Sequence, residues 1–301
     1  MSGSSNAEAR LFVVKNGLVV GADLEIELLL LAVFKPGSWS VLRVPDNLAA
    51  LAAVRAKAFD LILTSDKTSG REDIELLRQI RRVRPHTRLI ILAGESTPAD
   101  VITSMRESAF SYFSKPFCLN SLAEMVRIAS EGPCWDDGIE VVSGTPELIR
   151  ILARCDVKTA DRLVQFLNEI AELPEPETSH VAMAFREMLL NAIEHGGRLD
   201  PNQYVEIEYV RARHMVACHI TDPGPGFTLD EIPHAAIANP ADDPVRHIAL
   251  REEQGMRPGG FGVLLARQLV DELIYGQDGN EVLLIKYLDS TKQRAGQTSS
   301  Q

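Results

Sequence analysis

The sequence predicts two consecutive α/β domains, and three observations lead to this prediction. From residue 10 to residue 130, apolar strand-like runs alternate with helical patterns, which indicates a doubly wound domain with a mainly parallel sheet. Residues 131–138 collect glycine, proline and charge and therefore mark a linker. Residues 139–290 combine amphipathic helices with strands of alternating polarity, which predicts a helix layer over a mixed sheet.

The composition is that of an ordinary globular chain of 301 residues, with 45% hydrophobic and 24% charged residues. A formal net charge of −11 argues against a nucleic-acid partner held through its phosphates. The apolar run LEIELLLLAVF contains Glu25 and Glu27 and is too short to span a membrane. The start, MSGSSNAEAR, lacks the basic region of a signal peptide, and no cysteine pair has metal-site or redox-motif spacing. We therefore expect a cytoplasmic protein with reduced thiols.

The first half begins with RLFVVKNGLVVG, which reads as two strands joined at Asn16-Gly17, a strong hairpin signal. Regular alternation follows, and each helix is closed by proline, glycine or a polar turn. The expected elements are helix 23–34, strand 39–44, helix 47–59, strand 60–64, helix 72–85, strand 88–94, helix 98–108, strand 110–117 and helix 118–130.

The segment ESAFSYFSKPF at 107–117 resembles the G-A-x-D-Y-L-x-K-P-F signature of receiver domains in two-component response regulators. The resemblance extends over about residues 18–130 and implies the flavodoxin-like (βα)5 fold. It does not supply the receiver chemistry, because the aligned phospho-accepting position is Ser65 and the Thr or Ser position is Ala93. Of the family's functional set, only Lys115 and the aromatic Tyr112 remain.

The acidic pair that would hold Mg²⁺ in a receiver is also missing. Its position falls either on Lys15-Asn16 or on Gly21-Ala22, with Asp23 beside the second pair. Strand alternation would turn Asp66, the neighbour of Ser65, to the other face. We expect a domain that is not phosphorylated as receivers are, in which the Lys115 ammonium pairs with Asp66 or Asp23.

The second half opens with a strand pair, 139–144 and 147–154, and a helix at 156–170 that is capped by Asp156. The next helix, AFREMLLNAIEHGG, has a polar stripe in which Glu187, Asn191 and His195 are four residues apart. Asparagine offers Mg²⁺ a neutral oxygen, and a glutamate one turn away could act as a general base. A solvated helix face would show the same pattern.

Two glycine-containing stretches follow that helix. DPGPGF starts at Asp222, directly after the strand MVACHIT, and could be a tight turn or a carboxylate that accepts from an exocyclic amine. RPGGFGVLLARQLVDEL opens a helix behind a glycine cluster, which suits either a cap or a phosphate. The order and spacing of the three stretches favour a nucleotide site.

These stretches resemble the N, G1 and G2 boxes of the GHKL ATPases, and most closely the anti-sigma-factor serine kinase branch. The resemblance covers about residues 138–288 and implies the Bergerat α/β sandwich with ATP and Mg²⁺ as cofactors. It implies Glu187 as catalytic base and Asn191 as Mg²⁺ ligand, with Asp222 reading adenine. The remaining implied nucleotide contacts are His195, Gly224, Gly226, Gly259, Gly260 and Gly262.

Between the glycine boxes, residues 228–256 form a long polar stretch where this family has its ATP lid. Arg246, Arg251 and Arg257 could reach phosphates there, or could lie on an ordinary solvated loop. The chain departs from the branch at Phe261, where Arg or Leu is frequent, and at Asn280, where Thr is frequent. A polar tail, 291–301, is expected to be disordered.

The resemblance implies a Ser/Thr protein kinase that acts by partner switching on a STAS-like antagonist or a sigma factor, with the receiver-like half as regulator and a homodimer as one possible state. A nucleotide-gated binding module without kinase activity shares every motif. A histidine kinase would need a paired-helix domain before the ATPase, and residues 156–180 offer one helix.

Overall fold

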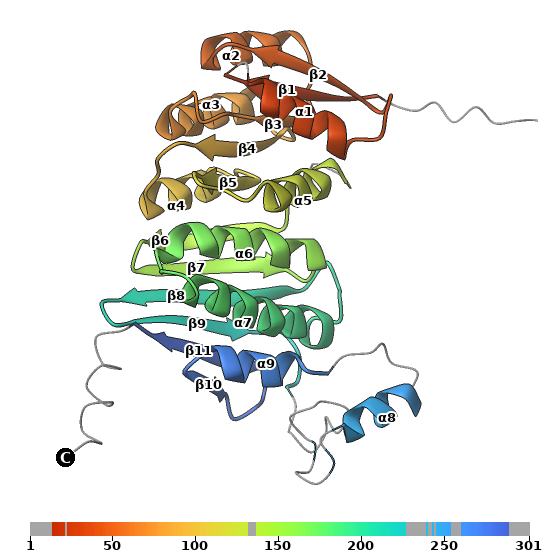
Figure 1. Ribbon diagram of the computed structural model, residues 1–301, viewed down its shortest axis with the longest axis vertical. Coiled ribbons are helices and arrows are strands. Elements are labelled where there is room, and N and C mark those ends of the chain that lie inside the picture. The colour runs from red at the N-terminus through yellow and green to blue at the C-terminus, as the bar shows by residue number, and fades with distance from the viewer. Residues whose placement is uncertain are drawn as a thin grey trace, which may run out of the picture. The chain divides into compact units, whose positions relative to one another are not determined.

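The computed structural model describes residues 14–21, 23–131, 137–226, 239, 243, 245–253 and 260–288. These residues form two sheets with helices against them (Figure 1). They separate into two compact units, which comprise the described residues of 1–94 with 114–135 and the described residues of 95–113 with 136–301. The expected linker and tail lie largely outside the described residues, so the predicted domain boundaries stay predictions.

The first sheet has five strands in the order β2-β1-β3-β4-β5, and its β1, β2, β3 and β4 pair in parallel. This order is that of the flavodoxin-like doubly wound fold, so the fold class predicted for the first half is confirmed. Its elements are β1 (Lys15–Val20), α1 (Leu24–Val33), β2 (Trp39–Val44), α2 (Asn47–Ala56), β3 (Leu61–Leu63), α3 (Gly70–Val83), β4 (Arg88–Ala93), α4 (Pro98–Arg106), β5 (Ser111–Ser114) and α5 (Leu119–Ser130).

The hairpin predicted at Asn16-Gly17 is wrong. Both residues lie inside the single strand β1, where Gly17 pairs with Val41 of β2 on one side and with Leu61 of β3 on the other. The strand continues into Leu18–Val20, whose side chains are fully buried. Parallel pairing on both sides and burial of the following residues outweigh the local turn preference of the Asn-Gly pair.

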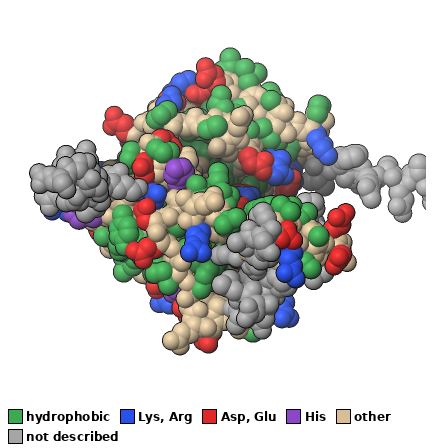
Figure 2. Space-filling model, turned by 60° about the horizontal axis from the view of Figure 1, so that its bottom comes forward, with side chains coloured by type: hydrophobic (Ala, Val, Ile, Leu, Met, Phe, Trp, Pro, Cys, Tyr) green, Lys and Arg blue, Asp and Glu red, His purple; other side chains and the backbone are tan. Residues whose placement is uncertain are grey.

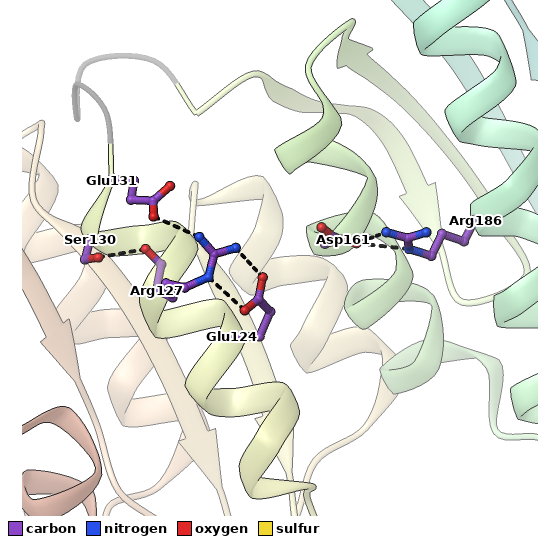
Figure 3. A network of polar contacts seen from close by, with 6 residues as sticks. All are labelled: Glu124, Arg127, Ser130, Glu131, Asp161 and Arg186. Carbon is purple, nitrogen blue, oxygen red and sulfur yellow. Dashed lines mark hydrogen bonds and ion pairs between the residues drawn. The ribbon is translucent and has the colours of Figure 1, made fainter. Parts of the chain in front are cut away.

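Side chains near the helix ends bind the ends of the helices that accompany the first sheet. Asp23 caps α1 by accepting from Glu25 N and Ile26 N, and Thr97 with Asp100 forms a capping box on α4. At the end of α5, Arg127 binds Glu124 and Glu131 on either side of it (Figure 3). These three residues are about half exposed, so we expect the pairs to add little stability.

The second sheet has six strands in the order β10-β11-β9-β8-β7-β6, with antiparallel neighbours throughout. Helices α6, α7 and α9 lie on one of its faces, which gives an α/β domain of the GHKL type (Figure 1). Its elements are β6 (Ile139–Thr145), β7 (Leu148–Arg154), α6 (Val157–Ala171), α7 (Glu177–Asn191), the π-helical segment η1 (Ala192–Gly196), β8 (Tyr204–Ala212), β9 (Met215–Thr221), α8 (Arg246–Glu253), α9 (Gly262–Leu269), β10 (Glu272–Tyr275) and β11 (Glu281–Tyr287).

Register explains the core of this unit. Ile207 lies opposite Ile151 on one side and Ile220 on the other, and Ile220 lies opposite Val282. All four side chains are buried, so one row of apolar residues crosses four strands. The alternate residues of these strands are more exposed, as the alternating sequence pattern predicted. In β8 they include Glu206 and Glu208, whereas in β11 they include the apolar Leu283 and Ile285.

The surface carries both signs of charge. On the face that Figure 2 shows, acidic and basic side chains are interspersed with apolar ones. None of the helices in the described ranges has both the length and the apolar character that crossing a membrane requires.

Candidate nucleotide-binding site

The first and third predicted motifs meet where α7 packs against α9. A Cβ atom added to Gly262, the first residue of α9, would lie 2.6 Å from Oε2 of Glu187. The Glu187 carboxylate therefore lies directly against the backbone at the start of α9. Glycine at position 262 permits this approach, since a larger side chain would displace the carboxylate. The free N–H groups of a helix N-terminus favour anions such as phosphate in the same place.

The first and second motifs meet at Asp222. A Cβ on Gly196 would lie 2.1 Å from Cγ of Asp222, and one on Gly224 would lie 2.9 Å from Cα of Gly196. The end of the α7 segment, the Asp222 side chain and the loop at Gly224 are therefore in direct contact. All three motifs that the sequence placed far apart converge on the α7–η1 segment.

Asp222 is held in place by main-chain bonds. Its N–H donates to the carbonyl of Asn280 at 2.9 Å, and its Oδ1 accepts from Gly224 N at 2.8 Å. Burial raises the pKa of the Asp222 carboxyl, while the bond from Gly224 lowers it. Asn280, which departs from the family pattern, thus aligns the Asp222 backbone, and its Nδ2 also reaches the Asp222 carbonyl at 3.4 Å.

The α-helix of the predicted polar stripe ends before His195. It ends at Asn191, and the next five residues form η1, in which Gly197 N donates to Ala192 O at 2.8 Å. His195 therefore lies in a π-helical turn and not in α7. His195 is exposed, and its nucleotide contact stays a prediction. Single π-turns within helices are frequent at functional sites.

Two further predicted glycines are described. Gly226 has φ +79°, and a Cβ there would lie 1.6 Å from the carbonyl oxygen of Asp278, so its close approach is to the turn before β11. Gly260 lies just before α9 with φ +90°. Gly259 and Arg257 fall outside the described residues.

One described part of the predicted lid contacts the start of α9. Asn239 Oδ1 accepts from His247 N at 2.9 Å, so its Nδ2 must donate to His247 Nδ1 at 2.6 Å. The His247 ring packs edge-on against Phe261 at 4.5 Å between centroids, which gives this departure from the family a contact with α8. Arg246 lies in α8 and is exposed.

Sequence reasoning missed Gly196 and Cys155. Gly196 was read as the end of a helix, although its lack of a side chain makes room for Asp222. Cys155 Sγ lies 2.1 Å from the position of a Cβ on Gly197, and burial raises the pKa of its thiol to about 11. The H-G-G ending of the helix was the available signal for Gly196, whereas no local pattern marks Cys155.

The carboxyl ends of the parallel strands form a second polar site. Ser65 follows β3, and a Cβ on Gly21, which follows β1, would lie 2.1 Å from Ser65 Oγ. Of the two alignments left open for the acidic pair, this contact favours Gly21-Ala22, since Lys15-Asn16 lies at the opposite end of β1. Ala22 itself falls outside the described residues.

Lysines engage the acids at this edge. Lys115 forms an ion pair with Asp66, and Lys67 Nζ lies 3.5 Å from Asp23 Oδ2. The Asp66 hydrogen bond raises the pKa of Lys115. The predicted pairing of Lys115 with Asp66 is therefore confirmed. The other receiver positions, Ser65, Ala93 and Tyr112, are all buried.

Two family models match this chain. Residues 22–127 match the response regulator receiver domain, and residues 153–286 match the histidine kinase-like ATPase domain. The chain therefore combines a receiver domain with a histidine kinase-like ATPase domain, as the sequence motifs predicted. An ATPase domain of this kind implies ATP binding.

Curated relatives match the receiver part. Sporulation initiation phosphotransferase F of Bacillus subtilis (strain 168) is 28% identical over 111 residues, which are 36% of this chain and 89% of that protein. Transcriptional regulatory protein ZraR of Klebsiella oxytoca is 28% identical over 105 residues, 35% of this chain, and the match spans only 24% of ZraR. A response regulator structure from Thermotoga maritima is 24% identical, with 39% of this chain and 98% of that chain covered and a TM-score of 0.34.

Proposed function

We propose that this protein is an ATP- and Mg²⁺-dependent Ser/Thr protein kinase of the partner-switching type, with the receiver domain as its regulatory part. The main supporting observation is the contact of the Glu187 carboxylate with the glycine backbone that opens α9. It puts a potential base beside the N–H groups that suit a phosphate. The proposed protein partner is a STAS-like antagonist or a sigma factor.

The residues present fit ATP and Mg²⁺. A Cβ atom at position 262 would lie 2.6 Å from Glu187 Oε2 and one at position 196 would lie 2.1 Å from Asp222 Cγ, so glycine at both positions lets the backbone come close to the two acids. Asn191 lies one turn after Glu187 on α7 and offers one amide oxygen. The described residues contain no cluster of three His, Cys, Asp or Glu that could hold a metal, so Mg²⁺ would depend on phosphate oxygens and water for its other ligands.

Each residue has a distinct proposed role. Glu187 accepts the proton of the partner's hydroxyl as that oxygen attacks the γ-phosphorus of ATP, the bond from that phosphorus to the β–γ bridging oxygen breaks and ADP leaves. The backbone at Gly260 and Gly262 binds phosphate. Asp222, as a half-buried acceptor, receives a hydrogen bond from the exocyclic amine of adenine. Bound Mg²⁺ supplies charge neutralisation on the phosphates. Asn191 would hold that ion and thereby orient the terminal phosphate toward Glu187.

The binding test compares Asn191→Ala with Asn168→Ala, an exposed position on α6. Loss of a metal ligand should weaken Mg-ATP binding by roughly 10-fold or more, whereas Asn168→Ala should match the wild type. Isothermal titration calorimetry with and without Mg²⁺ measures both. Equal affinity of Asn191→Ala and wild type would remove the metal assignment.

The activity test incubates the full chain and its co-purifying proteins with labelled ATP. Acid-stable label on a partner's Ser or Thr supports the kinase. ATP binding without transfer to any partner would favour the alternative, a nucleotide-gated binding module. Acid-labile label on a histidine of this chain would instead indicate a histidine kinase.

A further inference from the structure

Two main-chain carbonyl groups near the start of β5 accept hydrogen bonds from side chains. Phe110 O accepts from Arg162 Nε at 2.9 Å, and Tyr112 O accepts from Gln165 Nε2 at 3.1 Å. β5 is the last strand of its sheet, and carbonyls two residues apart point to the same side of a strand. Side chains of α6 therefore cover an edge that would otherwise be free to pair with another strand.

Arg162 and Gln165 hold this edge tightly. They lie three residues apart on one face of α6 and are only 4% and 8% exposed. The Arg162 guanidinium lies 4.1 Å from the centroid of the Phe110 ring and also donates to the carbonyl of Asp137. Separating these groups would leave a buried charge and buried carbonyls without partners, so α6 and residues 110–112 should move together.

The same helix packs against α7. Asp161, the residue before Arg162, accepts from Arg186 Nε at 3.1 Å, and Figure 3 shows this pair reaching from α6 to α7. Arg186 directly precedes Glu187. The pair itself is partly exposed and adds little energy, but it shows how near α6 lies to the segment that carries the proposed base.

We propose that Arg162 and Gln165 are positioning residues, which make α6 follow the edge of β5 and thereby set the placement of α7 with Glu187 and Asn191. This inference rests on the proposed ATP site. A protein that binds residues 95–113 would then change the affinity for nucleotide. Because coupling between two sites is reciprocal, nucleotide must also change the stability of the 110–114 backbone.

Hydrogen exchange of the full-length protein tests this reciprocity. With Mg²⁺ and a non-hydrolysable ATP analogue, we expect exchange in a peptide covering 110–114 to slow by about 5-fold or more, the usual lower range of coupling between sites. Gln165→Met keeps the side-chain length and removes the donor to Tyr112 O. It should abolish this slowing while α7 is still protected and the analogue still binds. Asn168→Ala, on the exposed side of α6, should behave as wild type.

Arg162→Lys is the second variant, because it keeps the charge but loses the planar group that stacks on Phe110. It should show the same loss, with an unchanged circular dichroism spectrum as the check of folding. The proposal would be overturned if wild-type protein bound the nucleotide analogue without slower hydrogen exchange at 110–114. It would also be overturned if hydrogen exchange at 110–114 slowed in Gln165→Met as much as in wild type. Failure of the analogue to bind the wild type at all would refute the ATP site itself, a result that calorimetry distinguishes from the other two.

Discussion

The two polar sites of this molecule use the same kinds of side chain in opposite ways. At the carboxyl edge of the five-stranded sheet, Asp66 and Asp23 are engaged by Lys115 and Lys67. Beside the six-stranded sheet, the Glu187 carboxylate lies against the glycine backbone at Gly262. The first arrangement neutralises its acids within the protein, whereas the second places its acid beside the N–H groups of a helix start.

The neighbours of a carboxylate therefore decide what it can do more than its presence does. Both sites lie where their folds usually place functional groups, at the ends of parallel strands and at a helix start behind glycine. At the first, the acids are paired with lysines, whereas at the second the Glu187 carboxylate lies beside the backbone at the start of α9. We therefore propose that the reaction takes place at the second site and that the first has a regulatory role.

The largest effect, on the rate of phosphotransfer, is expected at Glu187. Glu187→Ala should lower phosphotransfer by about 10²–10⁴-fold, the usual contribution of a general base, and leave nucleotide binding close to wild type. Single-turnover transfer of label to the partner measures the rate. Glu177→Ala, in the first turn of the same helix, is the matched control. A Glu187→Ala protein with wild-type rates would mean that the contact with Gly262 has no catalytic role.

The next largest effect is expected at Asp222, for which we propose contact with adenine. Asp222→Asn exchanges an acceptor oxygen for a donor at a half-buried position, so adenine binding should weaken by about 1–3 kcal/mol. Asp278→Asn removes a charge from the neighbouring exposed turn and should have no such effect. Competition between ATP and GTP gives the measurement. Equal competition of the two nucleotides for the wild type would contradict the role of Asp222.

In the first unit, the Asp73 carboxylate is buried in α3. Burial raises its pKa to about 6, and hydrogen bonds from Asn47 and Thr68 lower it only in part. Because folding raises this pKa, the protonated Asp73 carboxyl stabilises the folded protein below the unfolded pKa of about 4. This stability is lost as the pH rises through about 6. Its contribution to the free energy of unfolding should change by roughly 2–3 kcal/mol over that range.

Asp73→Asn should remove this part of the pH dependence. The difference in the free energy of unfolding between the variant and wild type should therefore shift in favour of the variant as the pH rises from 4.5 to 7.5. Urea unfolding followed by tryptophan fluorescence measures both proteins at both pH values. Glu75→Gln, exposed on the same helix, should leave the profile within about 0.5 kcal/mol. Parallel profiles for wild type and Asp73→Asn would show that Asp73 is charged at neutral pH without penalty.

At the receiver edge we expect no phosphorylation. Acetyl phosphate with Mg²⁺ should leave the full-length protein unmodified at the receiver edge. Ser65 stands at the acceptor position and the nearby acids are paired with lysine. Intact mass and acid-lability tests report any acyl phosphate. A stable, stoichiometric phosphate on Asp66 or Asp23 would remove the contrast between the two sites.

Much of the fold was predictable because its signals are local. The strand and helix alternation predicted both sheets, and Asp23 and Asp156 were visible as helix caps. The Asn16-Gly17 prediction was wrong because pairing with β2 and β3 depends on residues more than twenty positions away. A local turn preference carries no information about such partners.

The site was predictable as three motifs but not as one geometry. The sequence indicated Glu187, Asn191 and Asp222, while the contact between Gly196 and Asp222 depends on how η1 meets the end of β9. The π-turn that contains His195 has no reliable sequence signal. The contacts of Arg162 with Phe110 and Asp137 join residues that are distant in sequence, which no local pattern reveals.

The bonds from α6 to β5 also have a consequence for handling this protein. A fragment cut after residue 130 would keep β5 but lose Arg162 and Gln165, which satisfy the carbonyls of Phe110 and Tyr112. An uncovered strand edge with unpaired carbonyls is a template for intermolecular β-pairing. The receiver half produced alone would therefore be prone to self-association and precipitation, and a dimer observed for such a fragment would report the missing helix rather than the natural assembly.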